Sequence, residues 1–371
     1  MQSSAPFPMT QALELATQAL FLSNPNPRVG CVLTAANGEI IGQGFTQRAG
    51  GPHAEVMALR DAAARGRDVR GATAYVTLEP CSHHGRTGPC CDALIEAGVA
   101  KVVASIADPN PLVAGRGFER LRAAGVEVEV GPGAQASREL NIGFFSRMVR
   151  GTPWVRVKTA ASLDGTTALA NGQSQWITSA AARADGHAWR ARACAVLTGI
   201  GTVLDDDPQL DVREVETPRQ PHVVVVDSQL QMPQNARLLA KTGRDCYVYT
   251  AVEDTRRHDA LLSAGISHVI CLPNAAGKVN LAAMLQDLGR RGINELHVEA
   301  GHKLTGSLIR EHVVDELLVY LAPRLLGSGW GMADFGPLAS LAEGVALDFR
   351  LVEQMGPDLR IVARVHDRDI F

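Results

Sequence analysis

Short strand-like runs alternate with helical stretches along the chain, and this alternation limits the folds that the sequence can adopt. In the first third, TQALELATQAL and HAEVMALRDAAARG have the apolar spacing of helices. VGCVLTAANGEIIGQGF predicts strand, Asn-Gly turn and strand, and ATAYVTLEP and AKVVASIADP predict further strands. We therefore expect an α/β fold with a sheet between layers of helices and a functional site in the loops after strand ends.

A break in this pattern divides the chain into two expected domains. GVEVEVGPGAQASREL contains Gly and Pro, and after a helical stretch the residues GTP precede a fresh strand, WVRVKTA. We place the boundary near Arg150, which gives domains at 1–150 and 151–371, and 371 residues are enough for two cores. The strands of a second α/β domain are predicted by ACAVLTG, PHVVVVDS, DCYVYT, SHVICL, NELHVEAG and DELLVYLAP.

Charge and hydropathy exclude two classes of partner. The net charge of −3 gives no basic surface for nucleic acid. No run approaches the roughly 20 apolar residues that span a bilayer, and the N-terminus lacks the charged and apolar regions of a secretory signal. We expect a cytoplasmic protein without nucleic-acid or membrane partners. Its seven irregularly spaced Cys residues favour free thiols or metal ligands over disulfides.

One His and two Cys in two short segments form a set of candidate metal ligands. GGPHAEVMAL contains His53, and PCSHHGRTGPC contains Cys81 and Cys90. Three N and S ligands leave one position of a tetrahedral zinc for water, as in catalytic sites. Each ligand follows a proline, so we expect each at the start of a helix, where the free N–H groups favour a thiolate. Glu55 follows His53 by two residues and is the candidate proton shuttle to that water.

Alternatives to this zinc set stay open. Cys91 could replace Cys90, although we expect it to be the next helical residue, turned away. A closed structural site would need a fourth ligand such as His83, His84 or Cys91. The other cysteines have no ligand type beside them and are expected to be ordinary thiols: Cys31, Cys194, Cys246 and Cys271.

The His-x-Glu segment with its Pro-Cys and second Cys resembles the zinc-deaminase signature, but with eight residues between the cysteines instead of two. At NPNPRVGCVL, GGPHAEVMAL, LEPCSHHGRTGPC and ADPNPLVAGRG the sequence resembles the deaminase half of the bifunctional riboflavin-biosynthesis enzymes, in which this longer loop is the usual form. The sequence resembles the reductase half of these enzymes at VKTAASLDGTTA, SQWITS, TVLDDDPQLDVR and VEAG. The resemblance covers almost the whole chain, in order.

This family resemblance implies a cytidine-deaminase-like three-layer α/β/α domain followed by a dihydrofolate-reductase-like α/β domain. It implies hydrolytic deamination of 2,5-diamino-6-(ribosylamino)-4(3H)-pyrimidinone 5′-phosphate. Reduction by NADPH then converts the ribosyl group of 5-amino-6-(5-phosphoribosylamino)uracil to ribityl. The implied cofactors are Zn²⁺ and NADPH, the partner is a small phosphorylated pyrimidine, and the family suggests a dimer or tetramer formed through the reductase domain.

The matching motifs also imply residue roles. In the deaminase half, Asn26 and Arg86 would hold the substrate. Cofactor positions in the reductase half are Ala161, Trp176, Thr202, Asp206 and a turn made of Gly301, His302, Lys303, Leu304, Thr305, Gly306 and Ser307. Substrate positions there are Ser174, Arg190, Leu210, Arg213 and Glu299. The two arginines can bind phosphate bidentately, and Lys158 and Glu299 are candidates for ribose contact or proton handling.

Plainer interpretations stand beside these roles. NPNPRVG could be a turn, Arg86 could be solvated, Trp176 could belong to the core and Arg190 could face water from a helix. His302 and Lys303 stand where the family commonly has smaller or uncharged residues, and Lys303 could reach the 2′-phosphate of NADPH. The rival functions are a nucleic-acid base deaminase, which would need a basic groove, and a binding module with a structural zinc.

Overall fold

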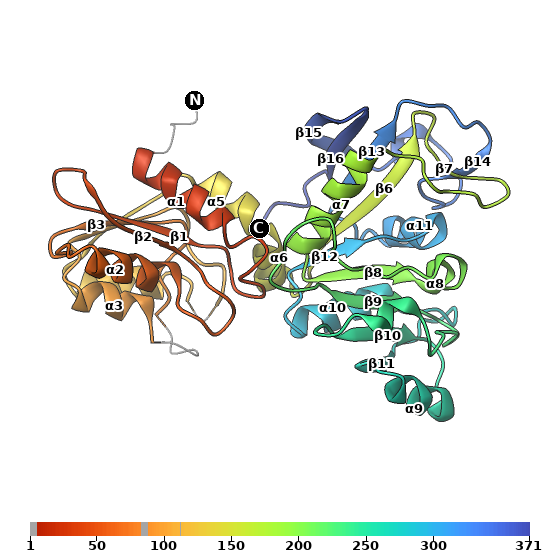
Figure 1. The fold of residues 1–371 in the computed structure, drawn as a ribbon, viewed down its shortest axis with the longest axis horizontal. Coiled ribbons are helices and arrows are strands. Elements are labelled where there is room, and N and C mark those ends of the chain that lie inside the picture. Colours follow the sequence, from red (N-terminus) through yellow and green to blue (C-terminus); the bar gives the residue numbers. More distant parts are fainter. Residues whose placement is uncertain (1–5, 83–87, 112) are drawn as a thin grey trace. The chain divides into compact units, whose positions relative to one another are not determined.

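The structure is a computed structural model that describes residues 6–82, 88–111 and 113–371. It forms two compact units, Met1–Arg150 and Gly151–Phe371 (Figure 1). Among the described residues, no helix has the length and apolar character that a bilayer crossing needs.

The first unit is a five-stranded sheet between helices, ordered β2-β1-β3-β4-β5. Its strands are β1 (Gly30–Thr34), β2 (Ile40–Phe45), β3 (Thr73–Val76), β4 (Lys101–Ala104) and β5 (Glu127–Val130). Strand β1 pairs antiparallel with β2 and β3, and the other pairs are parallel. Helices α1 (Phe7–Thr17) and α5 (Ala134–Leu140) cover one face, and α2 (Ala54–Ala64) and α3 (Cys90–Glu96) the other (Figure 1). The first unit also contains the helices α4 (Arg116–Ala123) and α6 (Ile142–Arg150).

Two glycines of β2 allow α2 to lie directly on the sheet. A Cβ at Gly42 would come within 2.4 Å of the Ala58 carbonyl oxygen, and one at Gly44 within 2.5 Å of the Met57 Cβ. Because nothing larger than hydrogen fits there, the sequence GQGF fixes the distance between β2 and α2. The helix start that carries His53 is thereby held against the sheet.

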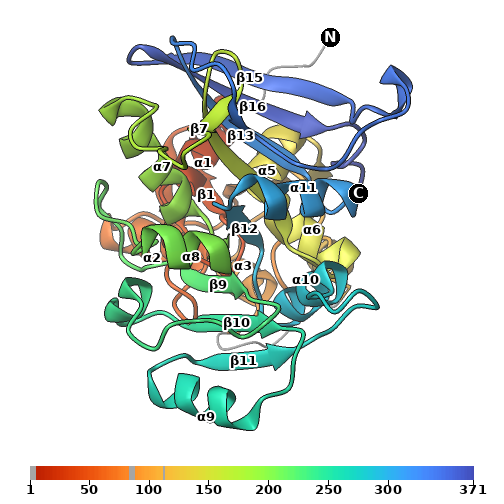
Figure 2. The same ribbon diagram turned by 90° about the vertical axis from the view of Figure 1, so that its right-hand side faces the viewer.

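The second unit contains a nine-stranded sheet ordered β11-β10-β9-β8-β12-β6-β13-β16-β15, seen from β15 to β11 in Figure 2. Its strands are β6 (Trp154–Ser162), β8 (Ala195–Gly199), β9 (His222–Val226), β10 (Cys246–Thr250), β11 (His268–Cys271), β12 (Glu295–Val298), β13 (Glu316–Ala322), β15 (Leu347–Met355) and β16 (Asp358–Val365). Only the β13–β16 and β16–β15 pairs are antiparallel in this sheet of described residues. A separate pair joins β7 (Thr166–Leu169) and β14 (Gly329–Gly331).

Both faces of the central parallel strands are buried, which explains continuous apolar runs such as VVVV in β9. One face packs on α10 (Leu281–Arg290) and α11 (His302–Arg310). The opposite face packs on α7 (Ala180–Arg192), α8 (Ile200–Asp206) and α9 (Thr255–Ser263) (Figure 2). Two short 3₁₀ helices, Arg237–Ala240 and Leu341–Glu343, complete the unit. The predicted α/β class is confirmed.

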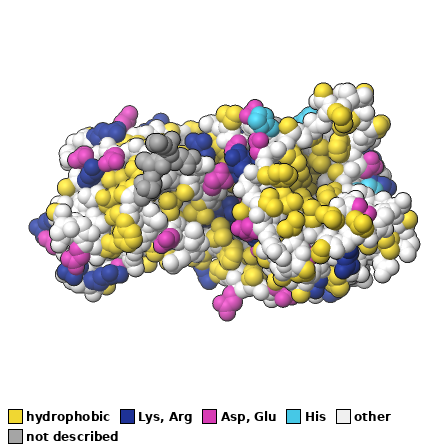
Figure 3. Space-filling model, turned by 90° about the horizontal axis from the view of Figure 1, so that it is seen from above, with side chains coloured by type: hydrophobic (Ala, Val, Ile, Leu, Met, Phe, Trp, Pro, Cys, Tyr) yellow, Lys and Arg dark blue, Asp and Glu magenta, His cyan; other side chains and the backbone are white. Residues whose placement is uncertain are grey.

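The hairpin of β15 and β16 was not predicted from the sequence, and it ends the sheet with an exposed edge strand. Phe349 and Val352 on β15 are 71% and 55% exposed. Apolar side chains also gather on the face of this unit seen in Figure 3. An edge strand that carries large apolar side chains is a surface on which another strand or sheet can pack.

Candidate metal centre and reductase site

The three predicted metal ligands lie together in the first unit. The His53 Nδ1 atom is 3.3 Å from the Cys90 sulfur and 3.6 Å from the Cys81 sulfur, and all the ligand atoms lie within 4.8 Å of one another. Tetrahedral zinc with ordinary Zn–N and Zn–S bonds separates an N and an S ligand by about 3.5 Å. This donor set therefore fits a zinc ion with one position left for water.

Helix starts position two of these ligands. His53 is the residue before the first turn of α2, and Cys90 is the first residue of α3. Cys81 lies in the loop after β3 and in no helix, so the expectation that all three sit at helix starts is wrong for Cys81. Pro80 fixes a φ angle that suits an extended segment as well as a helix start. The N-terminus of α3 nevertheless contacts Cys81, because the backbone N–H of Cys90 donates a hydrogen bond to the Cys81 sulfur at 3.3 Å.

Cys91 is turned away from the metal centre. Its thiol donates to the Pro80 carbonyl oxygen at 3.1 Å and lies 3.6 Å from that of Gly117. The geometry therefore favours Cys90 over Cys91 as the ligand. His83, His84 and Arg86, which the sequence brings close to Cys81, lie outside the described residues.

The pKa values of the groups in this centre are shifted in different directions. Hydrogen bonds from the Cys90 thiol and the His53 ring lower the pKa of Cys81 to about 4, although burial opposes this. The pKa of Cys90 is raised, first by its bond to Cys81. Burial, and then the charge of Cys81, raises the pKa of Glu55 to about 7. A buried carboxyl with a pKa near neutrality can both accept and return a proton.

A cavity of about 580 Å³ opens onto His53, Glu55 and Cys81. Its other walls are the loop after α1, with Asn26, the loop after β4, and α6. The loop after β4 contributes Asp108, whose pKa burial raises to about 7. Sequence reasoning proposed Asn26 but missed Asp108 and the neighbouring Asn110. Their place in the sequence could have indicated them, because they follow the carboxyl end of a buried parallel strand, where functional sites commonly lie.

Glu79 was also missed, although it holds two loops of this unit together. Its buried carboxylate accepts backbone N–H groups from Asp108 at 3.1 Å, Gly115 at 3.0 Å and Gly117 at 2.9 Å. A Cβ at Gly117 would lie 2.2 Å from the Pro80 carbonyl oxygen. The start of α4 is therefore tied closely to the loop that carries Cys81.

In the second unit, Lys158 of β6, Arg190 of α7 and Glu299, which directly follows β12, form a polar cluster. The Arg190 guanidinium forms a bidentate ion pair with Glu299, with one N–O distance of 2.8 Å, and donates to the Asp211 carbonyl oxygen at 3.0 Å. Burial opposes ionisation of Glu299, but Arg190 outweighs it and holds the pKa well below its ordinary value. Burial lowers the pKa of Lys158, against the attraction of Glu299. Arg190 therefore does not simply face water.

The other predicted substrate positions lie on loops. Arg213 is half exposed and pairs with Asp211 at 2.7 Å. Leu210 is buried, with a left-handed φ of 48°. Ser174 is half-buried in the loop between β7 and α7. In the same loop, Trp176 is 62% exposed, which excludes the alternative that it belongs to the core.

Apart from Trp176, which follows β7, the predicted cofactor positions lie at or after the carboxyl ends of β6, β8 and β12. Ala161 is buried in β6, and Thr202 and Asp206 lie on α8. The segment from Gly301 to Ser307 is helical, which corrects its description as a turn: Gly301 precedes α11, and the residues after it form the first turns. These turns include His302, Lys303, Leu304, Thr305, Gly306 and Ser307.

Two residues of this α11 segment face the protein interior. Thr305 is buried, and a Cβ at Gly306 would lie 1.8 Å from the Asp334 carbonyl oxygen. Their position is thus explained by packing. Gly301 and Lys303 are exposed, so the free N–H groups of the helix start remain accessible to a phosphate.

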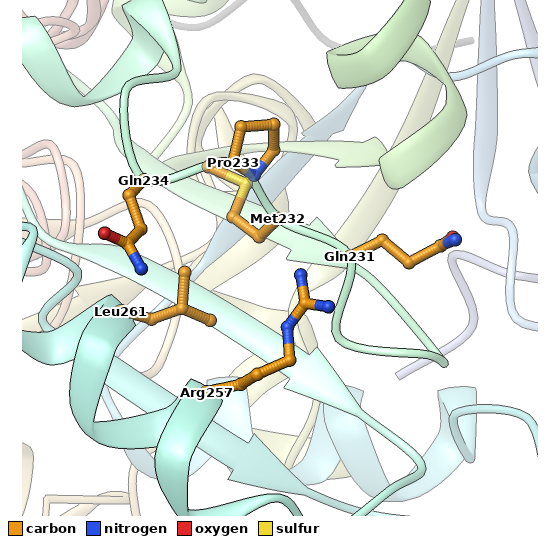
Figure 4. A pocket seen from close by; sticks show the side chains of 6 residues that line it. All are labelled: Gln231, Met232, Pro233, Gln234, Arg257 and Leu261. Atoms are coloured by element: carbon orange, nitrogen blue, oxygen red, sulfur yellow. The ribbon is translucent and has the colours of Figure 1, made fainter.

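A second cavity of the second unit holds none of the predicted residues. It measures about 490 Å³ and lies between the loop after β9 and α9 (Figure 4). Its lining consists of Gln231, Met232, Pro233, Gln234, Arg257 and Leu261. Arg257 is the only charged residue in this lining, which contains no carboxylate, His or Cys. The lining residues therefore offer no groups for acid–base or metal chemistry.

Comparisons with known families assign both units. Residues 153–361 match the RibD C-terminal domain, and residues 3–106 match the zinc-binding region of cytidine and deoxycytidylate deaminases. The predicted fold classes and the predicted pairing of a deaminase with a reductase are thereby confirmed.

Relatives match the chain from end to end. The riboflavin biosynthesis protein RibD of Escherichia coli is 46% identical, over 95% of this chain and 96% of its own length. A solved structure of Acinetobacter baumannii RibD has 40% identity and a TM-score of 0.88, covering 97% and 98% of the two chains. A Thermotoga maritima structure has 34% identity and a TM-score of 0.86, covering 96% and 97%. It is described as a diaminohydroxyphosphoribosylaminopyrimidine deaminase/5-amino-6-(5-phosphoribosylamino)uracil reductase.

Proposed function

Since this chain belongs to the RibD family and is a bifunctional riboflavin-biosynthesis enzyme, we propose that residues 1–150 are its deaminase and residues 151–371 its reductase. The first step hydrolyses the 2-amino group of 2,5-diamino-6-(ribosylamino)-4(3H)-pyrimidinone 5′-phosphate. The second step reduces the ribosyl group of the deaminated product to ribityl. The observation that carries the proposal is the His53, Cys81 and Cys90 cluster, of which His53 and Cys81 line one cavity together with buried Glu55.

In the deaminase, His53, Cys81 and Cys90 would hold Zn²⁺. When bound, zinc supplies a Lewis acid that makes a water nucleophilic near neutral pH. Glu55 would take the first proton of the attacking water and pass it to the ring nitrogen, and would then take the proton of the resulting hydroxyl group and pass it to the amino group, which leaves as ammonia. Asn26 lies in the wall of the same cavity and would bind the pyrimidine. Arg86 remains a proposed substrate contact on the family resemblance.

In the reductase, NADPH would lie along the carboxyl ends of β6, β8 and β12, against Ala161, Trp176, Thr202 and Asp206. When bound, NADPH supplies the hydride. The first turn of α11 offers exposed N–H groups, and Lys303 a positive charge, to a cofactor phosphate. Its proposed contacts are Gly301, His302, Lys303, Leu304, Thr305, Gly306 and Ser307, with the last residues acting through packing.

The substrate of the reductase would meet the polar cluster. Three N–H groups of Arg190 are already bonded to Glu299 and Asp211, so we assign the substrate phosphate first to Arg213. Lys158, whose pKa burial lowers, and Glu299 would contact the ribose and handle its protons. Ser174 and Leu210 complete the proposed substrate set.

We also propose that the protein is cytoplasmic and that two reductase units associate through the β15–β16 hairpin. The exposed edge and the apolar side chains of Phe349 and Val352 support this surface for a second copy.

Metal content and ammonia release test the deaminase assignment. Cys81→Ser is expected to lose both zinc and deamination, and Glu55→Gln is expected to keep zinc and lose deamination. Zinc retained in Cys81→Ser, or ammonia released at the normal rate by Glu55→Gln, would overturn the assignment.

A further inference from the structure

We propose that Arg147, on α6, binds the phosphate group of the deaminase substrate. This inference rests on the proposed deaminase function and extends it to the part of the cavity that α6 forms. No sequence motif singled out Arg147.

The charges of the cavity point to Arg147. It is the only Lys or Arg among the described residues that line the cavity. Acidic side chains are represented there by Glu55, Asp108 and Glu79. A phosphate that enters this surrounding needs a cation to offset the negative charges, and the described lining offers the guanidinium of Arg147.

The side chain of Arg147 is positioned by its own helix. Phe144 precedes it by three residues, lines the same cavity and is only 6% exposed. The guanidinium carbon of Arg147 lies 5.9 Å from the centre of the Phe144 ring. A cation over an aromatic face is attracted to it, which reduces the conformational freedom that phosphate binding would otherwise have to remove.

The helix itself is fixed to the loop that carries Asn26. The Arg28 backbone N–H donates to the Asn141 side chain at 2.7 Å, and the Asn141 amide donates back to the Arg28 carbonyl at 3.0 Å. The Arg28 guanidinium also donates to the Leu140 carbonyl at 2.7 Å, immediately before α6. Asn26 and Arg147 therefore belong to one braced wall. The metal ligands come from other segments, so the phosphate can be held on a different wall from the one that carries the reacting centre.

The chemistry of the guanidinium suits this role. Its planar fork forms two parallel hydrogen bonds to phosphate oxygens, whereas a lysine ammonium offers charge without that geometry. Charged hydrogen bonds of this kind contribute to affinity more than neutral ones, and removing them acts on substrate binding before it acts on the chemical step.

The experiment compares two substrates, the phosphorylated ribosylaminopyrimidine and the same compound without its phosphate. Deamination is measured as ammonia release by the full-length zinc-loaded protein and by Arg147→Ala, Arg147→Lys and Arg150→Ala. Arg150 is the matched control, because it lies on the same helix but does not line the cavity. Zinc content and far-UV circular dichroism show whether each variant is folded.

We expect Arg147→Ala to raise the KM of the phosphorylated substrate about 10- to 100-fold with little change in kcat. The KM of the dephosphorylated substrate should not change, Arg147→Lys should be intermediate, and Arg150→Ala should match the unaltered protein. An unchanged KM in Arg147→Ala, or equal increases for both substrates, would overturn the inference. If Arg147→Ala does not fold, Arg147→Lys decides by the same comparison of substrates.

Glu55→Gln in the same assay separates this inference from the proposed function. If that variant loses deamination while Arg147→Ala behaves normally, the deaminase assignment stands and the phosphate contact is wrong. If Glu55→Gln remains active, the deaminase mechanism itself is wrong.

Discussion

Cys90 donates its backbone N–H to the sulfur of Cys81 over 3.3 Å, so one helix N-terminus serves two thiol ligands. Cys90 supplies its own sulfur to the centre, whereas the sulfur of the next residue, Cys91, contacts the Pro80 carbonyl oxygen at 3.1 Å. Two adjacent cysteines with opposite orientations provide a direct test of the metal centre.

We predict that Cys90→Ser loses zinc and that Cys91→Ser retains it. The two variants differ by one position in the chain, so their difference reports the direction of the side chain and not the loss of a thiol. Zinc stoichiometry of the purified proteins is the measurement. Loss of zinc in Cys91→Ser with retention in Cys90→Ser would reverse the ligand assignment.

Glu79→Gln is expected to destabilise the first unit by about 2 to 4 kcal/mol, since either oxygen that becomes NH₂ stops accepting and leaves buried N–H groups unpaired. One oxygen accepts from Asp108 and Gly115 and the other from Gly117, so either the first two residues or the third lose their acceptor, and deamination should fall with zinc still bound. Urea unfolding followed by circular dichroism measures the change. Glu96→Gln on α3 is the control, because Glu96 is exposed, and an equal effect there would refute the anchoring role.

The second unit is expected to lose stability as the pH falls from about 6.5 towards 4. Burial, and then the charges of Arg190 and Arg213, lowers the pKa of His187 to about 4, so the unfolded chain binds a proton in this range and the folded chain does not. Its Nδ1 atom accepts the Arg213 backbone N–H at 3.4 Å, which protonation would prevent. Stability is therefore complete above the unfolded pKa and declines below it.

His187→Gln tests this pH dependence, because glutamine can accept the Arg213 N–H but does not titrate. The four Trp residues of the chain all lie in the second unit, so Trp fluorescence during urea unfolding reports on that unit. The variant should show a smaller loss of stability between pH 7 and pH 5 than the unaltered protein. Identical losses would show that His187 does not contribute.

Arg213→Ala is expected to raise the KM of the reductase for its phosphorylated substrate more than it lowers kcat. Arg213 is half exposed and only one of its nitrogens is bonded to Asp211 among the described contacts, so it retains donors for a phosphate. Steady-state kinetics on the deaminated intermediate provides the measurement. Arg256→Ala, on the exposed side of α9, should have no effect, and an unchanged KM in Arg213→Ala would remove it from the phosphate site.

The metal ligands and most strands could be predicted because their signals are local. His53, Cys81 and Cys90 are ligand types in short segments, and the apolar runs of the parallel strands reflect burial on both faces. Cys81 was misplaced because proline suits both helix starts and extended segments. In the missed β15–β16 hairpin, β15 lacks the alternation that indicates a strand, because most of its residues are exposed and its register shifts between Phe349 and Leu351.

The braces of the deaminase cavity could not be predicted, because their partners are distant in sequence. Glu79 contacts Gly117, and Arg28 contacts Asn141, only through the tertiary fold. Nothing in the sequence near Arg147 indicates that α6 lines the cavity of the metal centre. The sequence thus predicted which side chains carry the chemistry, but not the long-range hydrogen bonds that position them.

Consumption of NADPH by the purified protein, supplied only with the phosphorylated diaminopyrimidine, tests the central claim most directly. We predict that NADPH is oxidised only when this substrate is present, that Glu55→Gln abolishes the oxidation, and that the deaminated intermediate restores it in that variant. Oxidation by Glu55→Gln at the normal rate from the diaminopyrimidine alone would contradict the account, because reduction would then not depend on deamination at the proposed zinc centre.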